Sequence, residues 1–251
     1  MESTSFYITL PSNASMEYYS NNKASNYQIR MPRTFYLKGK FEVALAEIQY
    51  PHTWTTMREG IDFIIGYRET GSPRDQHLIV PNGYYNNIPE LCEAINEELD
   101  KAMENEDRPI VLKFDKITGR VHLKMMQNLE VFFTVGIAEM LGFIPNQIYH
   151  NKGRAEYKAD VKHGFYTMFV YCSLCEPQVV GDYYVPLLRN VNITGRDGDV
   201  ILKTYGEPHY VPVNTSKFDT IEINIKDDSG HNVSFESGKV VCKLHFRQKA
   251  I

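Results

Sequence analysis

The feature that most constrains the fold is a strict alternation of apolar and polar residues in the C-terminal third of the chain. Ile221, Ile223 and Ile225 alternate with polar residues, and a period of two residues is that of a β-strand with one buried face. Turn-forming residues follow at 227–230. The pattern therefore predicts a meander of three strands over residues 220–247, with strands at 220–226, 232–236 and 240–247.

Short segments of the same kind recur along the chain. A hairpin is predicted around Thr118-Gly119, between apolar runs at 111–114 and 121–125. In the segment 41–50 the apolar phase switches at Ala46-Glu47, as a β-bulge would cause, and Pro51 ends that strand. Further strands are expected at 6–10, 27–31, 61–67, 129–134, 166–172 and 185–191.

Two segments have helical spacing instead. Apolar residues recur every three or four positions over 88–99, and Asn87 with Glu90 fits a capping box at the start of this amphipathic helix. A shorter helix is predicted over 135–141 and ends at Gly142. Many strands with helices confined to connections predict an all-β protein, a single jelly-roll β-sandwich of antiparallel strands with an inserted amphipathic helix. One domain is expected over 1–251.

Composition excludes several classes of protein. The length of 251 residues suits a single all-β domain. A formal net charge of −4 is too close to neutral for binding a polyanion by bulk electrostatics, so a general nucleic-acid coat is disfavoured. No sequence-specific nucleic-acid partner is expected either. No apolar run approaches the roughly 18 residues of a membrane-spanning segment. The first residues lack the pattern of a secretory signal, so we expect synthesis and folding inside a cell.

No catalytic, cofactor-binding or metal-binding residue is predicted. Cys172 and Cys175 have the spacing of a redox or zinc motif, but residues three apart in a strand point to opposite faces unless the strand ends between them. The four cysteines are interpreted as buried structural thiols. The histidines lack ligand spacing, and His245 alternates onto a polar strand face, where a solvated or partner-facing role is expected. Asp227-Asp228 is interpreted as part of a turn.

The stretch 183–189 combines aromatic and aliphatic residues with a proline and an arginine. It fits a core strand entered through a rigid turn. It equally fits a subunit contact, because Tyr and Arg are enriched in the centres of interfaces. For an oligomer interface the candidate residues are Tyr183, Tyr184 and Arg189.

Several of these segments together resemble the minor capsid, or penton, protein family of Polinton (Maverick) transposons. The resembling stretches are FYITLPSN at 6–13, GKFEVALAEIQYP at 39–51, VYC at 170–172 with PLLR at 186–189, and GKVVCKLHFR at 238–247. The resemblance spans nearly the full length and lies in the joint order of strand and turn segments. It implies a non-enzymatic virion protein, a single jelly roll that assembles as a homopentamer at icosahedral vertices, surrounded by a double jelly-roll major capsid protein.

Other classes remain open from the residues themselves. A soluble β-sandwich binding module, lectin-like or cytokine-like, would have a ligand pocket. A cupin-type enzyme would need clustered histidines and a carboxylate around a metal, which the histidine spacings do not support. Half of a double jelly-roll major capsid protein is disfavoured because two eight-stranded rolls would leave little room for connections.

Overall fold

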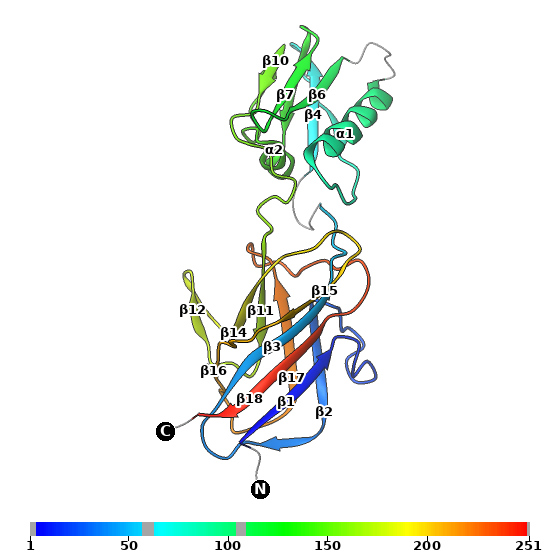
Figure 1. The fold of residues 1–251 in the computed structure, drawn as a ribbon. Helices are drawn as coiled ribbons and strands as arrows, with labels where there is room; N and C mark the ends of the chain where they lie inside the picture. The colour runs from blue at the N-terminus through cyan, green and yellow to red at the C-terminus, as the bar shows by residue number, and fades with distance from the viewer. Residues whose placement is uncertain (1–3, 57–62, 104–108, 250–251) are drawn as a thin grey trace. The chain divides into compact units, whose positions relative to one another are not determined.

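The computed structural model describes residues 4–56, 63–103 and 109–249. The chain forms two compact units (Figure 1): unit 1 comprises residues 1–54 and 165–251, and unit 2 comprises residues 55–164. Each unit has its own cluster of buried apolar side chains. The sequence pattern indicated one domain over 1–251 with an inserted helix, whereas the insertion has a core of its own. Periodicity shows which residues are buried but not which of them share a core.

Unit 1 is a sandwich of two antiparallel sheets. Its eight main strands are β1 (Ser5–Pro11), β2 (Asn26–Tyr36), β3 (Phe41–Pro51), β11 (Thr167–Cys172), β14 (Leu187–Asn192), β15 (Val200–Thr204), β17 (Lys217–Lys226) and β18 (Val241–Gln248). One sheet has the order β1-β18-β3-β15, and the short strand β16 (Val211–Pro212) also pairs with β3. The other sheet has the order β14-β11-β17-β2. Two sheets of four strands joined by crossings between them form a jelly roll, which confirms the predicted fold class.

The core of unit 1 lies between these sheets. Ile221, Ile223 and Ile225 of β17 point inward from one sheet, and Leu244 and Phe246 of β18 point inward from the other. All five are fully buried. Burial of each such side chain contributes about 1.5–3 kcal/mol relative to its exposure.

The predicted bulge in β3 is confirmed. Lys243 of β18 pairs with Glu47 of β3, but the next residue of β18, Leu244, pairs with Leu45. Ala46 is therefore the extra residue, and the apolar phase of β3 changes at this point because two residues face one partner position. The strand ends at Pro51 as expected.

Of the predicted meander over 220–247 only the first turn is confirmed: Lys226 bridges Asn232, and the Val233 amide donates to the Ile225 carbonyl (3.1 Å). The continuation into one three-stranded sheet is wrong. β17 pairs with β2 and β11, whereas β18 pairs with β1 and β3, so the two strands belong to opposite sheets. Between them Val233 is buried and Phe235 forms an isolated bridge with Trp54. A two-residue period identifies the buried face of a strand but carries no information about its neighbour.

Unit 2 contains two smaller antiparallel sheets. The first has the order β5-β4-β8-β9 and the second β10-β7-β6. The bounds are β4 (Ile64–Glu69), β5 (Gln76–Ile79), β6 (Ile110–Asp115), β7 (Arg120–Met125), β8 (Leu129–Phe133), β9 (Tyr149–His150) and β10 (Lys152–Arg154). The predicted hairpin around Thr118-Gly119 is the pair β6–β7. Of the predicted strand 61–67, residues 61 and 62 lie outside the described residues.

Two helices complete unit 2. Helix α1 (Ile88–Met103) buries the predicted apolar stripe, and the Glu90 amide donates to Asn87 Oδ1 (3.0 Å) as in a capping box. The Glu90 carboxylate accepts from the Asn86 amide (3.2 Å) rather than from that of Asn87. Helix α2 (Val135–Leu141) ends at Gly142, whose φ of 82° forms a left-handed cap.

Helix α1 contacts the two outermost strands of unit 2, β5 in the first sheet and β6 in the second. Strands β9 and β10 are separated by Asn151 alone, which has a positive φ of 61°, so the path continues from one sheet into the other. β5 and β6 lie at the two ends of that path. Covering strand edges in this way prevents them from pairing with other chains.

Candidate functional site

A β-hairpin projects from the connection between β11 and β14. It consists of β12 (Gln178–Val180) and β13 (Tyr183–Val185), joined by Gly181-Asp182. Gly181 has a φ of 62°, which a two-residue hairpin turn requires and glycine adopts readily. The predicted strand 185–191 is therefore two elements, because Pro186 separates β13 from β14.

Both faces of this hairpin carry apolar side chains. Val179 pairs with Tyr184, and their side chains are 76% and 72% exposed. Val180 pairs with Tyr183 on the opposite face, which Val185 shares. Because a two-stranded hairpin has no interior of its own, the apolar residues on one face or the other must stay in water unless something covers them.

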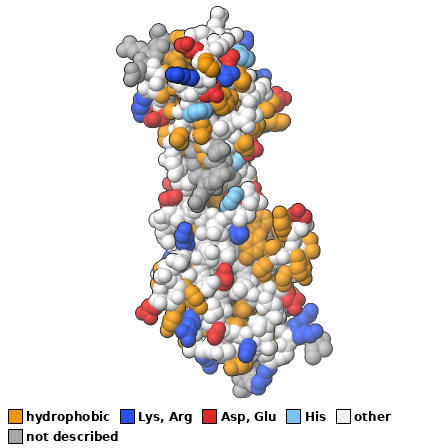
Figure 2. Space-filling view, turned by 180° about the vertical axis from the view of Figure 1, so that it is seen from behind, with side chains coloured by type: hydrophobic (Ala, Val, Ile, Leu, Met, Phe, Trp, Pro, Cys, Tyr) orange, Lys and Arg blue, Asp and Glu red, His pale blue; other side chains and the backbone are white. Residues whose placement is uncertain are grey.

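The second face of the hairpin borders a groove of about 850 Å³. Phe169 and Tyr171 form its opposite wall, at the outward-facing positions of β11, where polar residues are usual. Figure 2 shows the resulting apolar surface on one side of unit 1. Asp182, at the tip of the hairpin, and Asp228 contribute carboxylates to the groove lining.

The three predicted interface residues are not brought together. Tyr183 and Tyr184 lie exposed on the hairpin. Arg189 lies on β14, half-buried, with its guanidinium 3.6 Å from the centre of the Tyr205 ring. This stacking makes Arg189 part of the packing of unit 1.

Sequence reasoning did not single out Val179, Phe169 or Tyr171. Phe169 and Tyr171 alternate with the buried residues Met168 and Val170. In a strand with one buried face, aromatic residues at the alternate positions are a signal of a second covered face, and the sequence carries that signal. Its partner hairpin is too short to show a period.

The cysteines are buried thiols, as predicted. β11 ends at Cys172, and the Cys175 amide donates to the Cys172 carbonyl (3.0 Å), so both thiols lie on the same side. A hydrogen bond from Cys175 lowers the pKa of Cys172, and the same bond together with burial raises the pKa of Cys175. No group of three or more His, Cys, Asp or Glu residues suited to a metal occurs within 4–56, 63–103 and 109–249.

His245 lies on the outer face of β18, where the alternation placed it. Its Nε2 is 2.5 Å from Ser5 Oγ and its Nδ1 is 2.7 Å from the Tyr210 hydroxyl. The ring also stacks on Tyr7. Burial and the nearby Arg247 guanidinium lower the pKa of His245. The imidazole is thus a neutral member of a surface hydrogen-bond network.

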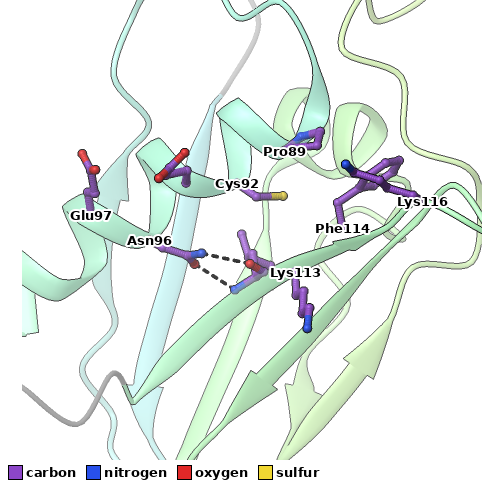
Figure 3. A pocket seen from close by; sticks show the side chains of 9 residues that line it. Pro89, Cys92, Asn96, Glu97, Lys113, Phe114 and Lys116 are labelled. Atoms are coloured by element: carbon purple, nitrogen blue, oxygen red, sulfur yellow. Dashed lines mark hydrogen bonds between the residues drawn. The ribbon is translucent and has the colours of Figure 1, made fainter.

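Unit 2 has a separate pocket of about 370 Å³ between α1 and β6 (Figure 3). Asn96 on α1 faces the edge of β6, where its Nδ2 donates to the Leu112 carbonyl (2.9 Å) and its Oδ1 accepts from the Leu112 amide (2.8 Å). The Cys92 side chain lines the same pocket, and burial raises its pKa to about 12. Asn96 thus takes the place of a neighbouring strand at this edge.

None of the helices formed by the described residues is long and apolar enough to cross a membrane. No protein-family model matches the sequence, and no curated protein sequence matches it significantly.

A solved structure, that of the mavirus penton protein, is similar to this chain at 14% sequence identity, with a TM-score of 0.52. The similarity covers 98% of this chain and 99% of the mavirus protein. It therefore includes unit 2 as well as the jelly roll. Over nearly its whole length, this chain has the fold of the mavirus penton protein.

Proposed function

We propose that the protein is a penton, or minor capsid, protein. In this proposal it is a non-enzymatic structural protein of a virus-like particle encoded by a Polinton (Maverick) element. It forms a homopentamer at the icosahedral vertices, within a shell of double jelly-roll major capsid protein. The fold shared with a penton protein from end to end supports this role.

The observation that carries the proposal is the hairpin β12–β13 with apolar side chains on both faces. Its outer face exposes Val179 and Tyr184, and its inner face borders the groove whose opposite wall is formed by Phe169 and Tyr171. Exposed clusters of this kind mark contact surfaces. Aromatic residues are also enriched in the buried centres of interfaces.

A closed ring needs two different patches, one meeting the other on the next copy. Stacked Phe6 and Phe35 rings place β1 over β2 on one side of the sandwich. The strand order then places β14 and β15 on the other side, to which the hairpin is connected. On the β1–β2 side, Tyr7, Met16 and Tyr18 are exposed large apolar residues. We assign them as the patch that meets the hairpin of the neighbouring copy.

The test is negative-stain imaging and mass measurement of the full chain, alone and with a candidate major capsid protein. Five-fold rings or vertex-bearing shells are expected. A chain that remains monomeric at high concentration, both alone and with the capsid protein, would contradict the proposal.

Tyr184→Ala should reduce ring formation while the thermal stability of the monomer stays within about 0.5 kcal/mol, the usual range for a surface change. Tyr157→Ala in unit 2 is the matched control, because Tyr157 is also well exposed. Equal losses of assembly and of monomer stability in Tyr184→Ala would show that the side chain acts in folding instead.

A further inference from the structure

Acidic and basic residues are distributed unevenly between the two ends of unit 1, although their numbers are equal. Unit 1 contains as many Lys and Arg residues as Asp and Glu residues. At the end where β3 finishes, however, the loops carry Asp197, Asp199, Asp228 and Glu236 against the two basic residues Arg196 and Lys239. The His52 amide, just after β3, donates to the Asp199 carbonyl (2.8 Å), which places that loop at this end.

The opposite end, where β1 begins and β18 finishes, carries a group of lysines. The Lys249 amide donates to the Lys40 carbonyl (2.8 Å), and the Gln248 side chain donates to the Lys38 carbonyl (3.3 Å). Lys217 pairs with Tyr36, next to Leu37. We call Lys38, Lys40, Lys217 and Lys249 the terminal lysine cluster; all four are exposed. Figure 2 shows basic side chains gathered at this end of unit 1.

Among the described residues at this end the carboxylates include Glu42, Asp219 and Glu176, whose amide donates to the carbonyl of Pro212, the partner of Glu42 (2.9 Å). Glu42 is close by but pairs with Arg247, with 2.5 Å between Glu42 Oε1 and Arg247 Nε. Asp219 is exposed near Lys217, and Arg33, also exposed, lies on the same strand as Tyr36. The balance at this end is therefore positive although unit 1 as a whole is neutral.

The residue types exposed at this end favour a nucleic-acid backbone as the partner. Lys217 pairs with Tyr36 and Lys38 follows it by two residues. The Tyr36 ring is 73% exposed and can pack against a sugar of the backbone. Binding to a lipid surface would instead use a broad apolar face below the basic residues.

We propose that the terminal lysine cluster binds the phosphate backbone of nucleic acid without sequence specificity. This inference rests on the proposed penton function, because it assigns the end of the roll that carries both termini to the interior of the particle. A five-fold ring would repeat the cluster around its axis and so convert weak contacts into a stronger combined one. The acidic end would then face away from the nucleic acid.

The experiment measures binding of the full chain to a labelled double-stranded DNA of random sequence by fluorescence anisotropy, over a series of salt concentrations. Neutralising roughly four phosphates per chain predicts a slope of log affinity against log salt of about −3 to −4 per bound protomer. The quadruple variant K38Q/K40Q/K217Q/K249Q should reduce the slope to near zero and weaken binding at low salt at least about tenfold. Glutamine keeps the backbone hydrogen bonds of these residues.

The matched control is K23Q/K152Q/K158Q/K239Q, which removes the same charge from four exposed lysines elsewhere. Retained binding in the control and lost binding in the cluster variant would support the proposal, whereas equal losses would overturn it. Tighter binding to anionic vesicles than to DNA, through the same lysines, would also overturn it. Ring formation is measured on the same samples, alone and with the major capsid protein. Rings without DNA binding contradict this inference alone, and a chain that stays monomeric in both conditions contradicts the penton function.

Discussion

Asn96 shows how a single side chain determines what a strand edge can do. Its carboxamide makes two hydrogen bonds with the backbone of Leu112, on the outer edge of β6. An unpaired edge of this kind is a template for pairing with another chain. Asn96 therefore occupies the backbone groups of Leu112 that another strand would otherwise pair with at this edge of β6.

Asn96→Ala should leave the Leu112 amide and carbonyl without these partners and destabilise unit 2 by about 1–3 kcal/mol. Hydrogen exchange of the Leu112 amide should become markedly faster than in the unchanged chain. Glu97→Ala is the control, because Glu97 is an exposed residue next to Asn96 on the same helix. Unchanged protection of the Leu112 amide would show that α1 shields the edge without this side chain.

The buried thiols should make the free energy of unfolding decrease as the pH rises through the alkaline range. Burial raises the pKa of Cys92 and of Cys242 to about 12 each, from an ordinary value near 9. As pH rises above 9, these thiols ionise in the unfolded chain but stay protonated in the folded one. Their contribution to the free energy of unfolding is therefore fully present below pH 9 and is lost progressively between pH 9 and about pH 12. Each thiol should lower the free energy of unfolding by about 1.4 kcal/mol per pH unit across this window.

Cys242→Ala should flatten that loss in unit 1 and Cys92→Ala should flatten it in unit 2. Denaturant unfolding at two alkaline pH values, compared with neutral pH, measures the difference. Each variant loses some stability at all pH values because a buried side chain is shortened, so the change with pH is the relevant quantity. Parallel pH profiles for a variant and the unchanged chain would contradict the prediction.

Among the elements, helix α2 depends on how its last turn ends. Gly142 has a φ of 82°, and a Cβ at this position would lie 2.3 Å from the Tyr157 carbonyl oxygen. The Tyr157 amide donates to the Gly142 carbonyl (2.9 Å). The helix end is therefore packed directly against the backbone of the segment that follows β10.

Gly142→Ala should destabilise unit 2 well beyond Gly71→Ala, which is the matched control. Gly71 has nearly the same φ, 83°, but open space around it. The control should cost roughly 1–2 kcal/mol for the left-handed backbone alone, and Gly142→Ala should add the cost of displacing the backbone at Tyr157. Thermal unfolding of both variants tests this; equal shifts would show that the segment at Tyr157 yields without cost.

The elements also show what sequence patterns can and cannot predict. The β3 bulge at Ala46, the α1 stripe and the α2 stop at Gly142 follow from local periodicity and turn chemistry, and all three are confirmed. The prediction that β17 and β18 lie in one sheet is wrong because sheet partners are set by contacts distant in sequence. At the candidate site, residue type alone makes Tyr183 and Tyr184 interface candidates, whereas the stacking of Arg189 on Tyr205 joins residues whose spacing has no pattern.

For the whole molecule, the main question is how a second unit is accommodated between two strands of one sandwich. Unit 1 ends its first part at Trp54 and begins its second part at Phe165. The two rings are 5.4 Å apart, and Trp54 also contacts His52 and Phe235. The chain therefore leaves the roll and returns to it at adjacent points. The insertion of unit 2 leaves the pairing of β3 with its neighbouring strands intact.

It follows that a chain in which a short Gly/Ser linker replaces residues 55–164 should still fold as a jelly roll. All eight main strands and the apolar cluster of unit 1 are retained, and two ring-to-ring neighbours need a linker of only a few residues. Trp54 is the single tryptophan of the chain, so its fluorescence reports directly on this junction. A blue-shifted emission and a cooperative unfolding transition are expected. Emission typical of solvent-exposed tryptophan, with no cooperative transition, would show that the roll needs unit 2 to fold.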